Sequence, residues 1–340
     1  MLTTSSQASD SLRRDPQSRS VDAQSSWSTG GQSLPEFLTA VYGVLADPAS
    51  ELAQANDALE GLFCALRSMR MSVASEQWQE CVQICRRHEL KSLLHEDPFT
   101  RRAFHKPRGY AGDAVMMDYI YGREEQWPVP QTNRVGEIVY EYTTTSPASN
   151  GVRARRGFVA DVLDRLAEDV PRPHVLSLAA GHLREAELAS AVRRRRLGRF
   201  LALDADPLSL AEITRAYACF GVETVQADIR KLVAGRAELG QFDLIYTTGL
   251  YDYLPQRLGR RLATSLFRML RPRGRLVIAN FLPSIHDIGY MEAYMDWYLT
   301  YRNREDMINL TMDIQEDLIR DITLWSEENH NVLFLDVSRA

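Results

Sequence analysis

The chain is poor in cysteine, in long apolar runs and in surplus positive charge, and each shortage excludes a class of protein. Four cysteines in 340 residues are too few for the disulfide framework of a small secreted domain. Lys and Arg number 40 against 45 Asp and Glu, and a net charge of −5 disfavours a dedicated nucleic-acid binder. No apolar stretch approaches the length of a membrane span. We therefore expect a cytoplasmic globular protein with no nucleic-acid partner and no stable membrane insertion.

The amino end also lacks the apolar segment of a secretory leader. Residues 1–33 are rich in Ser, Thr, Gln, Asp and Arg, which predicts a disordered tail. From residue 34 to residue 130, apolar residues recur at helical spacing, as at Phe37, Val41 and Val44. Pro35 suits the first turn of a helix. These features predict a helical cap domain over residues 34–130.

After residue 131 the pattern changes to short apolar strands that alternate with amphipathic helices. Strands are predicted at 175–180, 200–204, 224–227, 242–247 and 275–281, and helices at 152–166, 184–195, 207–218 and 257–270. Two further strands, 322–326 and 331–337, are separated by a short polar turn typical of a hairpin. The predicted fold class is α/β: a Rossmann-like, doubly wound, mostly parallel sheet with an antiparallel last strand, plus the N-terminal helical cap.

Ligands of an open parallel sheet bind outside the carboxyl ends of its strands, so the loops there carry the candidate site. Gly181 follows the first strand, where it favours a sharp turn, although a lone glycine also suits a mere connection. Asp204 ends the second strand, about twenty residues beyond the Gly181 turn, which is the spacing of an acid that binds a ribose. Asp206 precedes Pro207 and is expected to cap a helix. Asp228 follows the third strand, and its carboxylate is expected to accept the adenine amine.

These loops give residues 174–281 a resemblance to class I S-adenosylmethionine-dependent methyltransferases. The likeness rests on the Gly181 loop, the acid of the second strand, the Ala-Asp of the third and the Arg-Pro-Arg-Gly-Arg turn before the fifth. Ser177, Ala179 and Leu183 depart from the family pattern, which has an acid and two glycines there. The resemblance implies S-adenosylmethionine as cofactor. The cofactor-binding residues that it implies are Ala179, Gly181, Glu185, Asp204, Asp228, Ile229 and Gly249, with Tyr110 from a loop of the cap.

A narrower likeness concerns residues 106–113, 248–254 and 289–298. These segments resemble a bacterial methyltransferase subgroup associated with 3-hydroxypalmitic acid methyl ester, a quorum signal. The likeness implies a small or lipid-like substrate, with carboxyl O-methylation of a 3-hydroxy fatty acid as the first choice. Two alternatives stay open: a cyclase that converts S-adenosylmethionine into azetidine-2-carboxylate and methylthioadenosine, and a non-catalytic S-adenosylmethionine sensor.

Aromatic side chains after the fourth strand and in the long insertion at 283–321 are suited to hold a sulfonium by cation–π attraction. We expect the insertion to cover the site and to shape the substrate pocket, although its aromatic residues also have the spacing of a helix face packed on the core. The expected catalytic residues are Tyr251, Asp252 and His286, and the expected substrate-binding residues are Arg108, Tyr290, Met291, Tyr294, Met295 and Trp297.

Two other patterns are given structural interpretations. Cys81, Cys85 and His88 lack a matched second pair of ligands, so a buried helix face is favoured over zinc and no metal is expected. The basic run at residues 153–156 is interpreted as a solvated helix face. The oligomeric state is left open.

Overall fold

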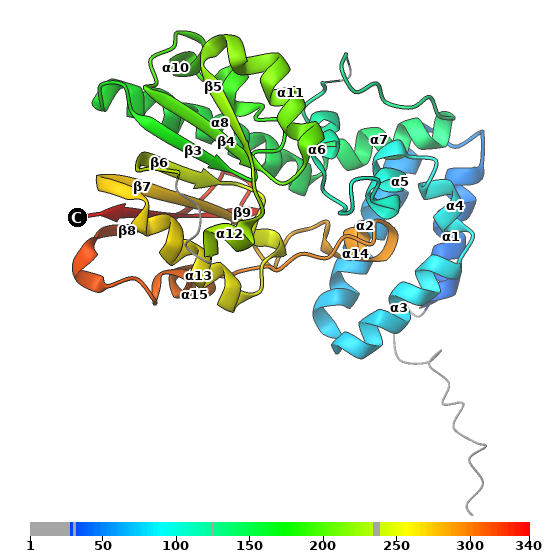
Figure 1. Cartoon of the computed structure of the whole chain (residues 1–340). Coiled ribbons are helices and arrows are strands. Elements are labelled where there is room, and N and C mark those ends of the chain that lie inside the picture. The colour runs from blue at the N-terminus through cyan, green and yellow to red at the C-terminus, as the bar shows by residue number, and fades with distance from the viewer. Residues whose placement is uncertain (1–27, 30–31, 124, 234–238) are drawn as a thin grey trace, which may run out of the picture.

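The structure is a computed structural model that describes residues 28–29, 32–123, 125–233 and 239–340. Figure 1 shows a helical body beside a twisted sheet that carries helices on its faces. The predicted disordered tail lies for the most part outside the described residues. Within it, β1 (Ser28–Thr29) and β2 (Gln32–Ser33) pair in antiparallel register.

The cap is helical, as predicted. Pro35 stands in the first turn of α1, and Ser33 and Glu36 form a capping box there. Asp97 and Asp113 accept backbone N–H groups at the starts of α5 and α6. The cap helices are α1 (Leu34–Ala46), α2 (Leu52–Ser72), α3 (Ser75–Arg87), α4 (Leu90–Leu94), α5 (Pro98–His105), α6 (Ala114–Ile120) and α7 (Arg134–Thr145). Although the predicted domain boundary falls before α7, this helix packs against α2 and α5.

The predicted fold class is confirmed, because seven strands form one mostly parallel sheet in the order β5-β4-β3-β6-β7-β9-β8. The strands are β3 (His174–Leu178), β4 (Arg199–Asp204), β5 (Val222–Gln226), β6 (Phe242–Thr247), β7 (Leu270–Phe281), β8 (Ile319–Ser326) and β9 (Val332–Arg339). β9 runs antiparallel to both β7 and β8, as the hairpin prediction requires. The order reverses between β3 and β6, which creates a switch point at the carboxyl ends of these strands.

Both faces of the sheet are buried, which explains why its central strands are continuous apolar runs. Val175, Phe200 and Leu244 face a core shared with the cap, whereas Leu176, Leu201 and Ile245 face a second core. The helices that follow the cap are α8 (Pro147–Asp169), α9 (Glu185–Leu188), α10 (Ser190–Arg193), α11 (Pro207–Tyr217), α12 (Ile229–Val233), α13 (Gln256–Arg268), α14 (Ile288–Tyr294) and α15 (Arg304–Ile308).

The single helix predicted at 184–195 is wrong, because α9 and α10 are separate helices. The chain is extended at Ala189, with φ −67° and ψ 114°. The carboxylate of Asp164 on α8 accepts the N–H groups of Ser190 at 3.1 Å and Ala191 at 2.6 Å. A capping group supplied by a distant helix therefore starts α10 afresh.

The insertion at 283–321 folds as α14, α15 and short 3-10 turns, and α14 packs against α2 and α3 of the cap. A Cβ on Gly289 would lie 2.4 Å from the backbone carbon of Leu66. Any residue other than glycine at this position would therefore push α14 and α2 apart. Among the described helices, none combines the length and apolar character needed to cross a membrane.

Candidate functional site

A cleft of about 770 Å³ lies at the switch point, between the carboxyl edge of the sheet and the cap. Its floor consists of the loops after β3, β4, β5 and β6, and its roof comes from α6, α8 and the loop at 107–112. This volume is in the range of small-molecule sites. Every residue predicted to bind the cofactor lines it: Tyr110, Ala179, Gly181, Glu185, Asp204, Asp228, Ile229 and Gly249.

The loop after β3 has an unusual backbone. Gly181 has φ +55°, and Ala179 and Leu183 have φ values of +53° and +54°. These two residues stand where the family pattern has glycines, and the backbone keeps the left-handed conformation that glycine favours. Non-glycine residues held in this region carry strain of about 1–3 kcal/mol each, and such strain clusters at functional sites. Ala179 and Leu183 therefore depart from the family pattern in residue type, while the loop after β3 keeps its left-handed backbone.

The acid of β4 fixes that turn. Asp204 is 7% exposed, and its carboxylate accepts the N–H of Gly181 at 2.8 Å and that of Asp206 at 2.9 Å. Burial raises the pKa of Asp204 above its ordinary value. Asp206 caps α11 by accepting the N–H of Leu208 at 2.9 Å, as predicted. Arg108, expected to bind substrate, pairs with Asp206 at 2.9 Å and so lies at the Asp204 end of the cleft.

Three aromatic rings form one wall of the cleft. The indole N–H of Trp297 donates to the Tyr253 hydroxyl at 2.9 Å, and the rings of Tyr110 and Tyr253 meet edge to face at 6.1 Å. A Cβ on Gly112 would lie 2.4 Å from the Trp297 ring and 2.6 Å from the Tyr253 hydroxyl. Only glycine lets the cap loop reach this wall.

Three ionisable side chains line the same cleft near α8. Asp252 is 3% exposed and accepts the N–H of Phe281 at 2.8 Å, and burial raises its pKa to about 7. Glu185 accepts the Tyr246 hydroxyl at 2.7 Å, and burial raises its pKa as well. Arg155 is 7% exposed, and its positive charge opposes the burial effect on the pKa of both Asp252 and Glu185, although none of the hydrogen bonds among the described residues joins it to a carboxylate. Its Nε has no partner, and its Nη2 reaches only the Met117 sulfur at 3.5 Å.

Two of the three expected catalytic residues lie elsewhere. Tyr251 is fully buried in the second core, where its hydroxyl donates to the carbonyl of Gly259 at 3.2 Å, because the 3-10 turn after β6 directs it away from the cleft. His286 lies against α2, where it stacks on Phe63 at 5.8 Å. Neither residue lines the cleft, which corrects their expected placement; Asp252 does line it.

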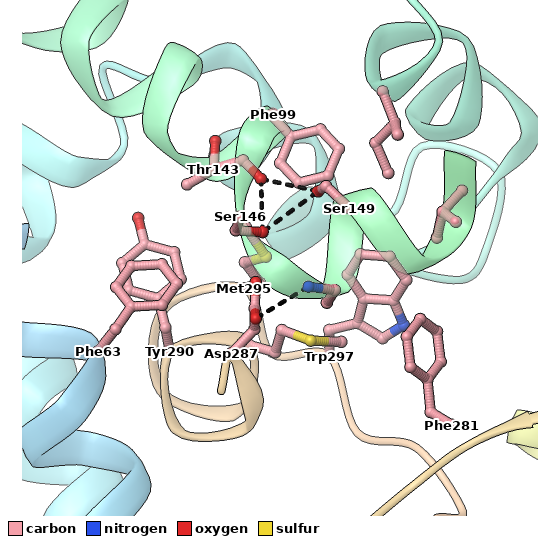
Figure 2. Close-up of a pocket in the computed structure, with 14 residues that line it drawn as sticks. Phe63, Phe99, Thr143, Ser146, Ser149, Phe281, Asp287, Tyr290, Met295 and Trp297 are labelled. Carbon is pink, nitrogen blue, oxygen red and sulfur yellow. Dashed lines mark hydrogen bonds between the residues drawn. The ribbon is translucent and has the colours of Figure 1, made fainter. Parts of the chain in front are cut away.

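The expected substrate residues are divided by the structure. Arg108 and Trp297 line the cleft, whereas Tyr290, Met291 and Met295 line a separate cavity of about 30 Å³. Figure 2 shows this cavity, with Phe63 and Tyr290 stacked at one side and hydroxyls of α7 and α8 at another. It shares Val152, Phe281 and Trp297 with the cleft. Tyr294 is fully buried and lines neither space.

Arg155 is the site residue that the sequence analysis missed. The run at 153–156 was expected to be solvated, yet Arg155 shares the buried face of α8 with Val152, Val159 and Leu163. Its neighbour Arg156 pairs instead with Glu187 at 2.9 Å. A charged residue at the spacing of an apolar stripe is the signal that could have found it.

Comparisons with known proteins bear on the fold. No protein-family model and no curated protein sequence matches the chain. Solved structures do. A possible exported protein from Bordetella parapertussis is 15% identical over 86% of this chain and 98% of its own, with a TM-score of 0.53.

Two further matched structures are methyltransferases. Magnesium protoporphyrin IX methyltransferase from Synechocystis, with S-adenosylhomocysteine bound, is 14% identical over 66% of this chain and 98% of its own, at a TM-score of 0.43. The N-methyltransferase NodS from Bradyrhizobium japonicum, in complex with S-adenosylhomocysteine, is 13% identical over 65% of this chain and 98% of its own, with a TM-score of 0.41. At such identities the likeness concerns the fold alone.

Proposed function

We propose that the cleft binds S-adenosylmethionine and that the chain transfers its methyl group to a small metabolite. The observation that carries the proposal is the convergence of the predicted cofactor residues. They come from four strand ends and one cap loop, and all of them line a single cleft at the switch point of the sheet. The strand ends meet because parallel strands share a carboxyl edge, whereas Tyr110 joins them from the cap, which the sheet alone does not require. This supports the interpretation of these segments as one site.

In this proposal the two ends of the cofactor meet different chemistry. Asp204 accepts the ribose hydroxyls, since each carboxylate oxygen retains a lone pair beyond its backbone bond. Asp228, whose carboxylate is exposed at the cleft edge, accepts the adenine amine. Arg155 and Glu185 suit the carboxylate and the ammonium group of the methionyl end. Tyr110 and Tyr253 present aromatic rings to the sulfonium cation.

Methyl transfer is an in-line displacement, so placing the acceptor supplies much of the catalysis. Asp252 adds a proton acceptor, because a buried carboxyl with a pKa of about 7 is half ionised near neutral pH. Acceptors that lose a proton on methylation, such as hydroxyls and amines, make use of this group. A carboxylate acceptor is already ionised and does not need it.

The resemblance favours the carboxyl group of a 3-hydroxy fatty acid as acceptor. Met291, Met295 and Leu299 recur at four-residue spacing, as residues that line an acyl channel would. Leu299 lines the cleft, whereas Met291 and Met295 enclose a cavity of about 30 Å³. That space holds roughly two water molecules. We propose that compact acids fit the cleft directly and that a long acyl chain requires Met295 and Trp297 to move.

Asp252 also favours a second candidate, cyclisation of the cofactor itself. The α-nitrogen would attack the γ-carbon, the bond from that carbon to sulfur would break, and methylthioadenosine would leave. The proton of the α-ammonium would pass to Asp252, whose raised pKa suits this role.

Product analysis separates these functions. The chain is incubated with S-adenosylmethionine alone and with 3-hydroxy acids of increasing length, and the nucleoside products are resolved by chromatography. S-adenosylhomocysteine that forms only with an acceptor supports methyl transfer, whereas methylthioadenosine without an acceptor supports cyclisation. Cofactor binding without either product points to a sensor. Asp204→Ala should lower the cofactor affinity at least tenfold, since a hydrogen bond to a charged acceptor contributes about 1.5–3 kcal/mol.

A further inference from the structure

A cluster of metal-ligating side chains lies on α2, outside the cleft. Glu60 and Cys64 are four residues apart on one helix face, and His286 reaches them from the segment that precedes α14. One donor atom from each residue lies within 4.8 Å of the other two. Among the described residues, these three side chains form the one group of His, Cys, Asp or Glu donors close enough together to hold a metal ion. His286, which was expected at the reaction centre, belongs to this cluster and does not line the cleft.

The distances suit a tetrahedral ion. The Cys64 sulfur lies 3.2 Å from Glu60 Oε1, and His286 Nε2 lies 3.4 Å from Glu60 Oε2. Zinc bonds of ~2.0–2.3 Å place neighbouring donors of a tetrahedral site about 3.3–3.7 Å apart. The two distances, each to a different oxygen of Glu60, are near this range, and one donor atom of each residue lies within 4.8 Å of the other two.

The ligand types are equally specific. Cysteine sulfur, imidazole nitrogen and a carboxylate oxygen form a zinc set, whereas Mg²⁺ and Ca²⁺ prefer oxygen alone. Nε2 of His286 is buried, and no hydrogen bond from the described residues satisfies it. A buried ring nitrogen that faces a carboxylate and a thiol is placed to ligate.

Surrounding groups hold the ligands in position. The Tyr142 hydroxyl on α7 donates to the Glu60 carboxylate, and Phe63 stacks on the His286 ring with an interplanar angle of 19°. Arg67 donates to the carbonyl of Ser284 at 3.2 Å and fixes the segment that carries His286. Such partners orient the ligands of metal sites, and their loss typically costs 10–100-fold in affinity.

We propose that Glu60, Cys64 and His286 bind Zn²⁺, with water at the fourth position. The ion would join α2 to the segment leading into α14, and so brace the helix that lines the small cavity of Figure 2. This site is independent of the cofactor cleft, and its test does not depend on any activity.

The test uses the full chain after removal of metals with a chelator, and Co²⁺ as a spectroscopic probe. We expect one equivalent of Co²⁺ to produce a thiolate-to-cobalt charge-transfer band, which Zn²⁺ then abolishes by competition. Cys64→Ser should remove the band, and His286→Gln should weaken binding at least tenfold. Tyr142→Phe should weaken it about tenfold. Cys219→Ser, at another exposed cysteine, should leave the charge-transfer band and the Co²⁺ affinity unchanged.

Thermal unfolding gives a second readout. Zn²⁺ should raise the melting temperature of the wild-type chain, because a ligand that binds only the folded state stabilises it. The rise should be lost in Cys64→Ser. Cys64 is exposed, and serine is nearly the same size as cysteine. Absence of a saturable charge-transfer band, or a band that persists unchanged in Cys64→Ser, would overturn the proposal.

Discussion

Arg155 carries a positive charge that acts on Asp252 and Glu185 through space, but no carboxylate of the described residues accepts a hydrogen bond from its guanidinium. Removing a cation from water costs several kcal/mol unless a partner replaces the lost hydration. The side chain is nevertheless held in the cleft by α8, with the Phe281 ring 5.8 Å from its guanidinium carbon. An anionic group of a ligand is the partner that this position lacks. We therefore interpret the buried Arg155 side chain as a preorganised contact for an anionic group of the ligand.

Arg155→Met should weaken S-adenosylmethionine binding at least tenfold, because it removes a charged hydrogen-bond donor. It should leave the free energy of unfolding unchanged or raise it, since an apolar side chain replaces a buried cation that has no direct hydrogen bond to a carboxylate of the described residues. Titration calorimetry and denaturant unfolding measure the two effects. Arg156→Met, which breaks the pair with Glu187 outside the cleft, should leave the affinity unchanged. A destabilised Arg155→Met chain with unaltered affinity would contradict this assignment.

Asp252 should make the stability of the chain depend on pH. Burial raises its pKa to about 7, above the unfolded value near 4, so between these values the folded state holds a proton that the unfolded state releases. The free energy of unfolding therefore falls as the pH rises from about 4 to 7. Asp252→Asn should remove that fall, while its side-chain oxygen still accepts the Phe281 N–H. Denaturant unfolding at several pH values tests this, and equal slopes in both chains would disprove it.

The same residue predicts a pH profile for activity. If Asp252 accepts a proton in the reaction, the rate should rise with pH through an inflection near 7 and then level off. In Asp252→Asn the inflection should disappear and the rate should fall by about 10²–10⁴-fold. A profile that keeps its inflection in Asp252→Asn would assign the proton transfer to another group.

The residue types of the site were predictable where the strand ends dictate them, and less so elsewhere. Asp204 and Asp206 follow directly from a strand end and a helix start, so their positions required no tertiary information. Tyr251 and Tyr253 are two residues apart in one 3-10 turn, yet one faces the core and the other the cleft. That choice depends on which neighbours fill each side, which the sequence does not reveal.

At the scale of elements, the loop at 106–113 closes the cleft against the insertion. Gly112 is the point of contact, with no room for a side chain between the loop and the Trp297 and Tyr253 pair. Gly112→Ala should push the loop away and lower the cofactor affinity about tenfold or more, measured by calorimetry. Gly43→Ala, in α1 with nothing within 4 Å, should leave the affinity unchanged and stabilise the chain by about 0.5–1 kcal/mol. Unaltered binding in Gly112→Ala would show that this contact does not control the cleft.

Helix boundaries were predictable where the capping residue is local. Pro35 and Asp206 mark the starts of α1 and α11 from within the sequence. The start of α10 depends instead on Asp164, 26 residues earlier, which accepts the N–H of Ser190. A long-range cap has no local signal, so a single helix was expected there.

Asp164→Ala should therefore destabilise the chain by about 1 kcal/mol, the typical loss for a helix cap. Denaturant unfolding measures the change. Asp161→Ala, at an exposed position of the same helix, is the matched control and should cost less than about 0.5 kcal/mol. Equal effects of the two substitutions would show that the cap of α10 contributes nothing.

At the scale of the whole molecule, the cap and one face of the sheet share a single apolar core. That continuity predicts one cooperative unfolding transition for both parts. Gly289→Ala should lower its midpoint, because the added methyl overlaps the Leu66 backbone and overpacking typically costs 1–3 kcal/mol. Gly61→Ala, on α2 with open space around it, should not. Two separate calorimetric transitions in the wild-type chain would refute a shared core.

The packing of α14 on α2 has a consequence for how the protein is made. Trp78 of α3 is 1% exposed, and its indole N–H donates to Glu292 of α14, more than two hundred residues later in the chain. Ribosomes add 5–20 residues per second, so the amino-terminal helices emerge on the order of ten seconds before their partner helix exists. During that interval they expose to water the apolar face that α14 later covers. Newly synthesised chains should therefore depend on chaperones that hold α1–α7 until α14 has been translated.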